Sequence, residues 1–290
     1  MRTRSASKRS AIPFEKKNAG RSVDVNLGIF AINLDRSPDR WERVVSQFSE
    51  QPWPLHRVAA IDGRDRDATL AYRGLTAAHP DGAGWSITRL RLVSFAEEAC
   101  FCSHLKALRE FLASDHSHAM ILEDDARIIG DLPPVVSVVG DVCQGETILK
   151  VSGTSRSGSR LALFVKQAGA FRIVRSFEPA SNATAYIVSK DAARALLDRA
   201  GRILAPYDDY LSAPGLHGCS VLHVSPWAIT NKWPKKDVPS TLEEGRSQMV
   251  RKRDPVSWVR QRFLRVRLRL SLWSSALRSK GRPIRAPWSA

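Results

Sequence analysis

The sequence predicts an α/β fold with a mostly parallel central sheet and helices on both of its faces. Short apolar runs of strand length, rich in branched residues, alternate with helical segments between residues 25 and 247. The chain has 290 residues, of which 43% are hydrophobic, so it is long enough to bury one large core. Neither an internal repeat nor a domain linker interrupts the pattern before residue 245.

The first expected elements are a strand, a tight turn and a helix. Residues 27–34 form an apolar run that ends in polar residues. Ser37, Pro38 and Asp39 then predict a helix start, with a capping hydroxyl, a proline at the first helical position and an acid in the first turn. A second strand is expected at 55–61, and the stretch 63–88, rich in Gly, Arg and Asp, is interpreted as a mobile substrate loop.

The later elements continue the alternation. A helix is predicted over 97–112, where one apolar stripe repeats at helical spacing, and an apolar strand follows at 118–122. Further strands are expected at 147–151, 162–165, 171–174 and 183–188. The last predicted helix, over 192–200, begins at the capping residue Ser189 and stops at Gly201.

Three consecutive acids, Glu123, Asp124 and Asp125, follow the apolar run at 118–122. Carboxylates at the end of a buried strand need a positive partner, and a divalent cation such as Mg²⁺ or Mn²⁺ prefers oxygen ligands. Successive strand residues point to opposite faces, so Glu123 and Asp125 can face the same way while Asp124 faces the other. We therefore expect Asp125 on the metal, with Glu123 or Asp124 holding the metal or a nucleotide. A solvated turn after the strand is the simpler alternative.

Charge and cysteine content limit the class of protein. The formal charge of +16 comes from the two ends, because residues 23–250 hold 26 basic and 27 acidic side chains. The four cysteines have no Cys-x-x-Cys spacing, and no histidine is identified as a partner at zinc-ligand spacing, which argues against a disulfide framework and a zinc site. No signal peptide and no run of 18 apolar residues is present, so we expect a cytoplasmic protein.

Several short motifs between residues 28 and 247 occur in the order found in one known family. They are Ile32-Asn33-Leu34-Asp35-Arg36-Ser37 with Arg40; Ala60-Ile61-Asp62-Gly63; Glu97, Cys100, Ser103, His104 and Leu105; Ile121-Leu122-Glu123-Asp124-Asp125; Tyr186-Ile187-Val188-Ser189; Pro206-Tyr207-Asp208 with Leu211; and Pro226 with Ser240. On these motifs the chain resembles glycosyltransferase family 25, the bacterial lipooligosaccharide-core galactosyltransferases. It departs from the family at Ala96 and Ala99, where glycines are usual.

The resemblance implies a GT-A-like nucleotide-diphospho-sugar transferase fold over residues 25–247. It also implies a hexosyltransferase that uses UDP-galactose as donor, a lipid-linked lipopolysaccharide or lipooligosaccharide core as acceptor, and inversion at the anomeric carbon. In such a reaction Mn²⁺ or Mg²⁺ neutralises the charge that develops on the departing diphosphate.

The remaining site residues are assigned by role. An inverting transfer needs a base near the acceptor hydroxyl, for which Asp208 is the first candidate and Asp209 the second, although Asp208 could equally cap a helix. The residues expected around the nucleotide are Asn33, Leu34, Arg36, Arg40 and Asp62, with Glu123 and Asp124. Those expected to contact the substrate are Glu97, Ser103 and His104.

The two ends are basic and are treated as separate segments. Residues 1–24 are expected to be a disordered arm, and residues 248–290 a basic tail whose apolar residues alternate with arginines as in an amphipathic helix. Such a tail favours docking on the anionic cytoplasmic face of the inner membrane. Two alternatives remain: a nucleic-acid-binding protein, against which the neutral central region argues, and an inactive nucleotide-sugar binder.

Overall fold

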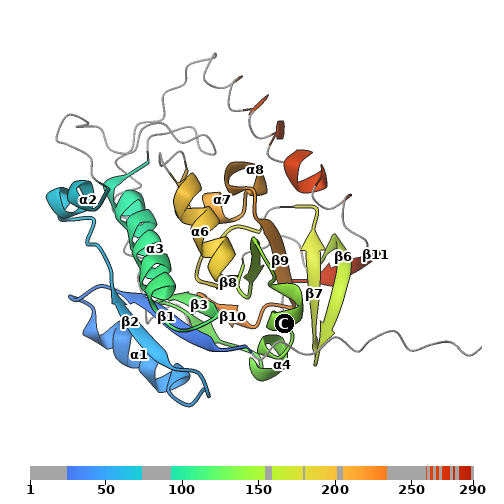
Figure 1. Ribbon diagram of the computed structural model, residues 1–290, viewed down its shortest axis with the longest axis horizontal. Helices are drawn as coiled ribbons and strands as arrows, with labels where there is room; N and C mark the ends of the chain where they lie inside the picture. Colours follow the sequence, from blue (N-terminus) through green and yellow to red (C-terminus); the bar gives the residue numbers. More distant parts are fainter. Residues whose placement is uncertain are drawn as a thin grey trace, which may run out of the picture.

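The structure is a computed structural model built around one large sheet flanked by helices (Figure 1). It describes residues 25–73, 93–153, 159–178, 180–200, 205–233 and 281–288, together with 259, 262–263, 266–267, 270–274 and 277. The sheet has nine strands in the order β11-β6-β7-β9-β5-β8-β3-β1-β2. These strands are β1 (Leu27–Asn33), β2 (Leu55–Ala59), β3 (His118–Glu123), β5 (Thr147–Lys150), β6 (Ser159–Ala168), β7 (Phe171–Ser176), β8 (Ala185–Ser189), β9 (Ser220–Ser225) and β11 (Arg282–Pro287).

Helices cover both faces of the sheet, which confirms the predicted α/β class (Figure 1). The helices are α1 (Pro38–Phe48), α2 (Arg66–Arg73), α3 (Phe95–Ala113), α4 (Pro133–Val136), α5 (Val139–Val142), α6 (Lys190–Arg199), α7 (Tyr207–Leu211) and α8 (Pro214–His217). Two short strands, β4 (Arg127–Ile128) and β10 (Ile229–Thr230), form a separate antiparallel pair.

The sheet is mixed, whereas the sequence predicted mostly parallel strands. Three of the neighbouring pairs are parallel, β1 with β2, β1 with β3, and β5 with β9. The other five pairs are antiparallel. Strand β8 runs in the opposite direction between β3 and β5, and β6 turns directly into β7 at Gly169, whose φ of +59° suits a residue without a side chain. Strand–helix alternation does not reveal such reversals, because strand pairing is not visible in a local pattern.

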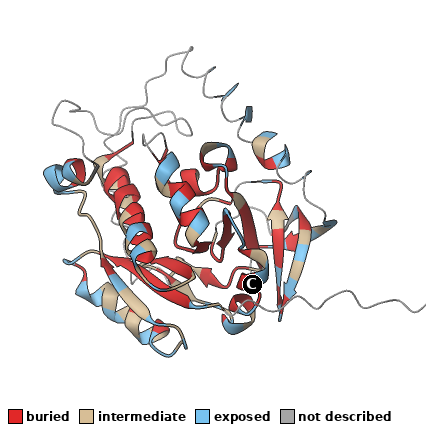
Figure 2. Ribbon diagram, in the orientation of Figure 1, coloured by how far each residue is buried: buried red, intermediate tan, exposed pale blue. Residues whose placement is uncertain are grey.

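The core lies on both sides of the sheet, and β1 shows why. Its alternate residues point to opposite faces, so Phe30 and Ile32 pack under α3, α6 and α7. Ile29 and Ala31 pack on the other face, against α1, α4 and α5. The helices accordingly show buried inner surfaces and exposed outer surfaces, and α3 is buried along most of its length (Figure 2).

The predicted capping serine is confirmed at α6, whereas α3 begins two residues before its predicted start and α1 differs in its capping. Ser94 and Glu97 form a reciprocal capping box at the start of α3, and the Ser189 side chain accepts a hydrogen bond from the backbone N–H of Ala192 in α6. Ser37 does occupy the N-cap position of α1, but its side chain makes no capping hydrogen bond. The proline at the first position of α1 is present as predicted.

The stretch 63–88 is not entirely a loop, because it contains α2. The Asp65 carboxylate accepts a hydrogen bond from the backbone N–H of Ala68, which stabilises the start of this helix. The composition of the stretch, rich in Gly and charged residues, hid the helix from sequence analysis. Residues 74–88 of the predicted loop lie outside the described residues, as does the whole predicted arm 1–24.

Part of the predicted tail joins the sheet. Strand β11 pairs antiparallel with the edge strand β6, and Trp288 beside it stacks on Trp227 with ring centroids 4.7 Å apart. The division of the chain into arm, domain and tail remains a prediction. Among the residues that the structure describes, no helix has the length and apolar character needed to cross a membrane.

Candidate active site

The acidic triplet lies where sequence analysis placed it, at the carboxyl end of β3. Parallel pairing aligns Asn33 at the end of β1 with Ala59 at the end of β2, and Ile32 with Glu123. The ends of three neighbouring strands therefore meet at one edge of the sheet. This is the edge at which α/β proteins commonly bind ligands.

Asp124 is held by two side chains from the β1–α1 region. One carboxylate oxygen accepts a hydrogen bond from Asn33 Nδ2 at 2.9 Å, and the other forms an ion pair with Arg40 Nη1 at 2.8 Å. Arg57 in turn donates to Asn33 Oδ1 through both Nε and Nη2. These contacts fix the turn after β1 and point Asp124 away from α3, as the alternation along the strand predicted.

Asp125 has a buried carboxylate oxygen, Oδ1, that makes no hydrogen bond within the described part of the chain. Burial, followed by the charges of Glu123 and Asp124, raises the pKa of Asp125 well above its usual value. A bound cation would remove this penalty, because its positive charge stabilises the ionised form. Asp125 and its neighbours thus fit a divalent metal, and the residue is fixed through its backbone oxygen, which accepts a hydrogen bond from Trp233 Nε1 at 2.7 Å.

Glu123 faces α3. Its Oε1 lies 3.3 Å from His104 Nε2 and 3.8 Å from Cys100 Sγ, and its Oε2 accepts a hydrogen bond from Thr184 Oγ1 at 3.3 Å. Burial raises the pKa of Glu123, but the hydrogen bonds from His104, Thr184 and Cys100, together with the charge of His104, outweigh burial and lower the pKa overall. Glu123 is therefore ionised at neutral pH.

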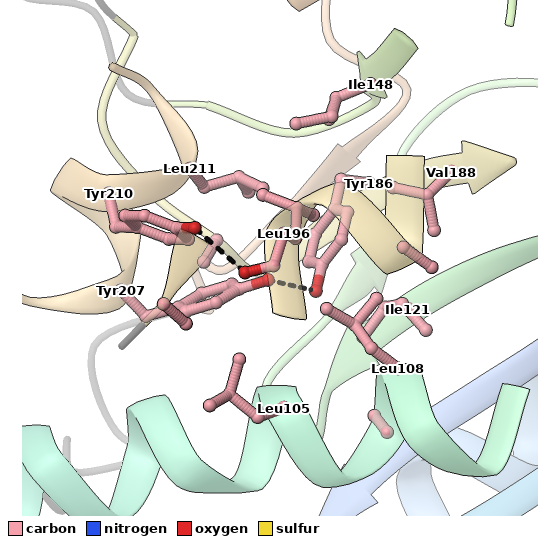
Figure 3. Close-up of a cluster of buried hydrophobic side chains, with 14 of the residues drawn as sticks. Leu105, Leu108, Ile121, Ile148, Tyr186, Val188, Leu196, Tyr207, Tyr210 and Leu211 are labelled. Carbon is pink, nitrogen blue, oxygen red and sulfur yellow. Dashed lines mark hydrogen bonds between the residues drawn. The ribbon is translucent and has the colours of Figure 1, made fainter. Parts of the chain in front are cut away.

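His104 connects Glu123 to two buried tyrosines. Its Nδ1 lies 3.2 Å from the Tyr186 hydroxyl, and its ring stacks on Tyr207 with centroids 4.0 Å apart. The two tyrosine hydroxyls form a hydrogen bond of 2.8 Å, which Figure 3 marks with a dashed line. The packing of α3 against β8 and α7 thus holds the imidazole rigidly beside Glu123.

The other two residues predicted to contact substrate make hydrogen bonds that shape α3 and its surroundings. Glu97 Oε2 accepts a hydrogen bond from the backbone N–H of Ser94 in the capping box. Ser103 Oγ accepts one from the backbone N–H of Ile61 at 2.9 Å, which ties the segment after β2 to α3. These hydrogen bonds do not test whether Glu97 or Ser103 contacts the substrate. Their assignment as substrate-binding residues stays a prediction.

Asp208 and Asp209 lie in the first turn of the short helix α7. Pro206 occupies the N-cap position, so the alternative that Asp208 caps this helix is wrong. The charges of Glu123, Asp208 and Asp125 each raise the pKa of Cys100, after the larger effect of burial. The candidate base Asp208 and the candidate metal ligands Glu123 and Asp125 are therefore all close enough to Cys100 on α3 for their charges to act on it.

Sequence analysis missed Lys150 at the end of β5. This lysine is 0% exposed, and its Nζ donates hydrogen bonds to Ala180 O and to Ser212 Oγ. Burial lowers its pKa to about 7, and the nearby charges of Asp208, Asp209 and Glu123 partly oppose that shift. The only local signal was a lysine that ends an apolar strand.

An exposed group of ion pairs borders the site at the end of β2. Arg36 Nε donates to Asp62 Oδ2 at 2.6 Å, and Arg57 Nη2 donates to Asp35 Oδ1 at 2.7 Å. Partial burial raises the pKa of Asp62, but its hydrogen bonds from Arg36 and from the backbone of Arg64 lower it overall. Leu34 takes part in this turn only through its backbone oxygen, which accepts a hydrogen bond from Ser37 N.

A hollow of about 700 Å³ opens beside these ion pairs. Its lining residues are Asp62, Arg64, Asp65, Arg66 and Asp67. Arginine side chains suit phosphate because their forked donors match its oxygens. Of the residues expected around the nucleotide, Asn33, Arg40 and Asp124 lie together at the sheet edge. Arg36 and Asp62 form an ion pair on the exposed border of that edge.

Comparison with known proteins gives one family match. The model of glycosyltransferase family 25 (LPS biosynthesis protein) matches residues 26–211, a span that includes the acidic triplet and both acids of α7. None of the curated proteins matches the sequence. Among solved structures, mannose-1-phosphate geranyltransferase from Thermus thermophilus is similar over 72% of this chain and 75% of that chain, with 11% identity and a TM-score of 0.36.

Proposed function

The chain belongs to glycosyltransferase family 25, and we propose that it transfers galactose from UDP-galactose to a lipopolysaccharide or lipooligosaccharide core acceptor with inversion. The observation that carries this proposal is the buried oxygen of Asp125 after β3, which has no hydrogen-bond partner among the described residues and lies near the ionised Glu123. A diphosphate leaving group needs a cation at such a place, because its negative charge grows as the sugar departs.

Asp125, with Glu123 as the second carboxylate, would hold Mn²⁺ or Mg²⁺. The ion supplies positive charge against the departing diphosphate. Asp124 is engaged by Arg40 and Asn33, so its role is to fix the β1–α1 turn that borders the nucleotide. Arg36, whose side chain is 35% exposed, is proposed to meet a phosphate directly.

Asp208 is the proposed base that takes the proton from the acceptor hydroxyl, with Asp209 as the second candidate. Both lie in the first turn of α7, close to the positive end of that helix. Lys150 lies near them, and their charges raise its pKa against the larger, opposite effect of burial. His104, Ser103 and Glu97 shape the α3 side of the acceptor space in this proposal.

The test is metal-dependent release of nucleotide from a panel of nucleotide-sugars, with Mn²⁺ or with chelator. We expect UDP release from UDP-galactose that needs both the metal and Asp125. Asp125→Ala should lower the rate by about 10²–10³-fold, while the exposed Asp131→Ala should leave it unchanged. Absence of metal-dependent release with every donor would overturn the proposal, and tight binding without release would indicate an inactive nucleotide-sugar binder.

The basic C-terminal segment is proposed to dock on anionic membrane at the cytoplasmic face, where the lipid-linked acceptor would lie. Support comes from six apolar side chains spaced four and three residues apart, all of which are 49–73% exposed. They are Val259, Phe263, Val266, Leu270, Trp273 and Leu277. Arg262 and Arg267, also exposed, lie among them. Deletion of residues 256–278 should abolish sedimentation with anionic vesicles, and undiminished sedimentation would refute this docking.

A further inference from the structure

Three side chains of different chemistry converge between α3 and β3. Cys100 and His104 lie one helical turn apart on α3, and Glu123 ends β3 opposite them. The sulfur, an imidazole nitrogen and a carboxylate oxygen all lie within 4.8 Å of one another. This corrects the sequence interpretation that no histidine stands at zinc-ligand spacing from a cysteine.

The separations match those of ligands around one small cation. A tetrahedral zinc ion with bonds of about 2.0–2.3 Å places neighbouring ligand atoms about 3.3–3.6 Å apart. His104 Nε2 lies 3.3 Å from Glu123 Oε1, and Cys100 Sγ lies 3.8 Å from the same oxygen. An ion could therefore bind with small side-chain movements.

The surroundings favour a cation and orient the ligands. Asp125 and Asp208 are near enough for their charges to act on Cys100, so negative charge accumulates around the cluster. The Tyr186 hydroxyl lies against His104 Nδ1, the typical outer contact that directs the other nitrogen toward a metal. The Glu123 side chain is 26% exposed, so solvent reaches part of this residue.

We propose that Cys100, His104 and Glu123 bind a zinc-class divalent ion at a position that shares only Glu123 with the proposed oxygen-ligated cation at Asp125. Sulfur and imidazole ligands select Zn²⁺ or Co²⁺ over Mg²⁺ and Mn²⁺. Binding releases the thiol proton of Cys100 to solvent, because only the thiolate is a metal ligand. Three protein ligands leave a fourth position for water, as in zinc sites that act on a substrate.

This proposal goes beyond the transfer reaction, and its test uses the metal alone. The full chain, stripped of metal, is titrated with Co²⁺ and followed by absorption. We expect one equivalent to produce thiolate-to-cobalt charge transfer in the near ultraviolet and visible bands of tetrahedral intensity. Zn²⁺ should abolish both signals, and Mg²⁺ should not. If the wild-type chain gives no thiolate signal, the proposal is wrong.

Variants assign the signal to the cluster. Cys100→Ala should abolish the charge-transfer band, whereas Cys102→Ser, on the same helix, should retain it. Tyr186→Phe, which removes only the hydroxyl at His104 Nδ1, should weaken Co²⁺ binding about 10–100-fold. Circular dichroism of each variant is the check that it is folded. A band that persists in Cys100→Ala would overturn the assignment.

A cross-comparison separates this site from the proposed active site. Asp125→Ala should lose Mn²⁺-dependent nucleotide release and keep the cobalt spectrum. The transferase proposal therefore fails if the wild-type chain releases no nucleotide, and the zinc-class site fails if no cobalt–thiolate band forms, each independently of the other.

Discussion

Two polar regions border the same sheet edge, and they differ chiefly in their access to water. The inner cluster comprises His104, Glu123, Lys150, Tyr186 and Tyr207. The outer rim comprises Asp35, Arg36, Arg57 and Asp62. In the inner cluster His104, Lys150 and Tyr186 are 0% exposed, whereas the rim ion pairs have side chains 29–75% exposed. An unsatisfied group costs far more free energy in the first region than in the second.

This difference in exposure indicates which substitutions should lower the stability of the fold and which should weaken ligand binding. Buried hydrogen bonds are strong because the medium around them screens charge poorly, so removing one partner leaves the other in a costly state. Exposed ion pairs contribute little to stability because water and salt replace each partner. The inner cluster should therefore be sensitive in unfolding experiments, and the rim in binding experiments.

The largest effect on stability is expected at Lys150. Lys150→Ala leaves a cavity and removes the donor to Ala180 O and Ser212 Oγ. We expect a loss of about 3 kcal/mol in the free energy of unfolding, measured by urea denaturation. The control is Lys166→Ala, which breaks an exposed ion pair with Asp141 and should cost less than about 1 kcal/mol. Equal losses in the two variants would contradict the contrast between the regions.

The pH dependence of stability sharpens the same contrast. The pKa of Lys150 is about 7 in the folded protein, while that of an unfolded lysine is about 10.4. Between these values the unfolded chain binds one more proton, so the stability of the wild-type protein rises with pH in this window. Below the folded pKa both states are protonated, and the penalty for burying the charge is fully present.

Lys150→Met removes this titration and keeps most of the side-chain volume. Relative to that variant, the wild-type protein should gain about 2 kcal/mol between pH 7 and pH 9. Urea denaturation of both proteins at several pH values measures the difference. Parallel stability curves for the two would show that Lys150 is ionised throughout and that its burial does not lower its pKa.

A smaller effect is expected from the tyrosine pair. Tyr207→Phe removes one hydroxyl of the contact at 2.8 Å, but the Tyr186 hydroxyl still has His104 Nδ1 as a partner. The expected loss in the free energy of unfolding is about 1 kcal/mol. Tyr72→Phe, whose hydroxyl accepts a hydrogen bond from Arg109 in an exposed position, should lose less. Urea denaturation of both variants measures the two losses, and a larger loss in Tyr72→Phe than in Tyr207→Phe would contradict the prediction.

The local parts of the fold could be predicted from the sequence. Apolar runs located β1, β3 and β8, and the capping residue Ser189 located the start of α6, whereas the cap of α3 at Ser94 was not predicted. Strand β11 was missed because its partner β6 lies more than a hundred residues earlier in the chain. The reversal of β8 was missed for the same reason, since strand direction depends on long-range pairing.

Site residues could be predicted where several of them are adjacent in the sequence. Three acids after an apolar strand identified Glu123, Asp124 and Asp125, but the pattern could not show that Arg40 would engage only the second of them. Lys150 was missed because its contacts with Ala180 and Ser212 arise from long-range packing at the end of β5. No local window contains both Lys150 and the acids of α7.

The smallest effect on stability, and the clearest effect on binding, is expected at Arg36. Its ion pair with Asp62 is 2.6 Å long, but both side chains are about one-third exposed, so Arg36→Ala should cost no more than about 0.5 kcal/mol in unfolding free energy. If Arg36 meets the donor phosphates, the same variant should raise the KM for UDP-galactose about tenfold, since a hydrogen bond to a charged group contributes about 1.5–3 kcal/mol. Arg194→Ala, from the exposed ion pair with Asp191 on α6, is the matched control and should change neither quantity. An Arg36→Ala variant that unfolds more easily but binds the donor normally would reverse the contrast, because the rim would then serve the fold and not the ligand.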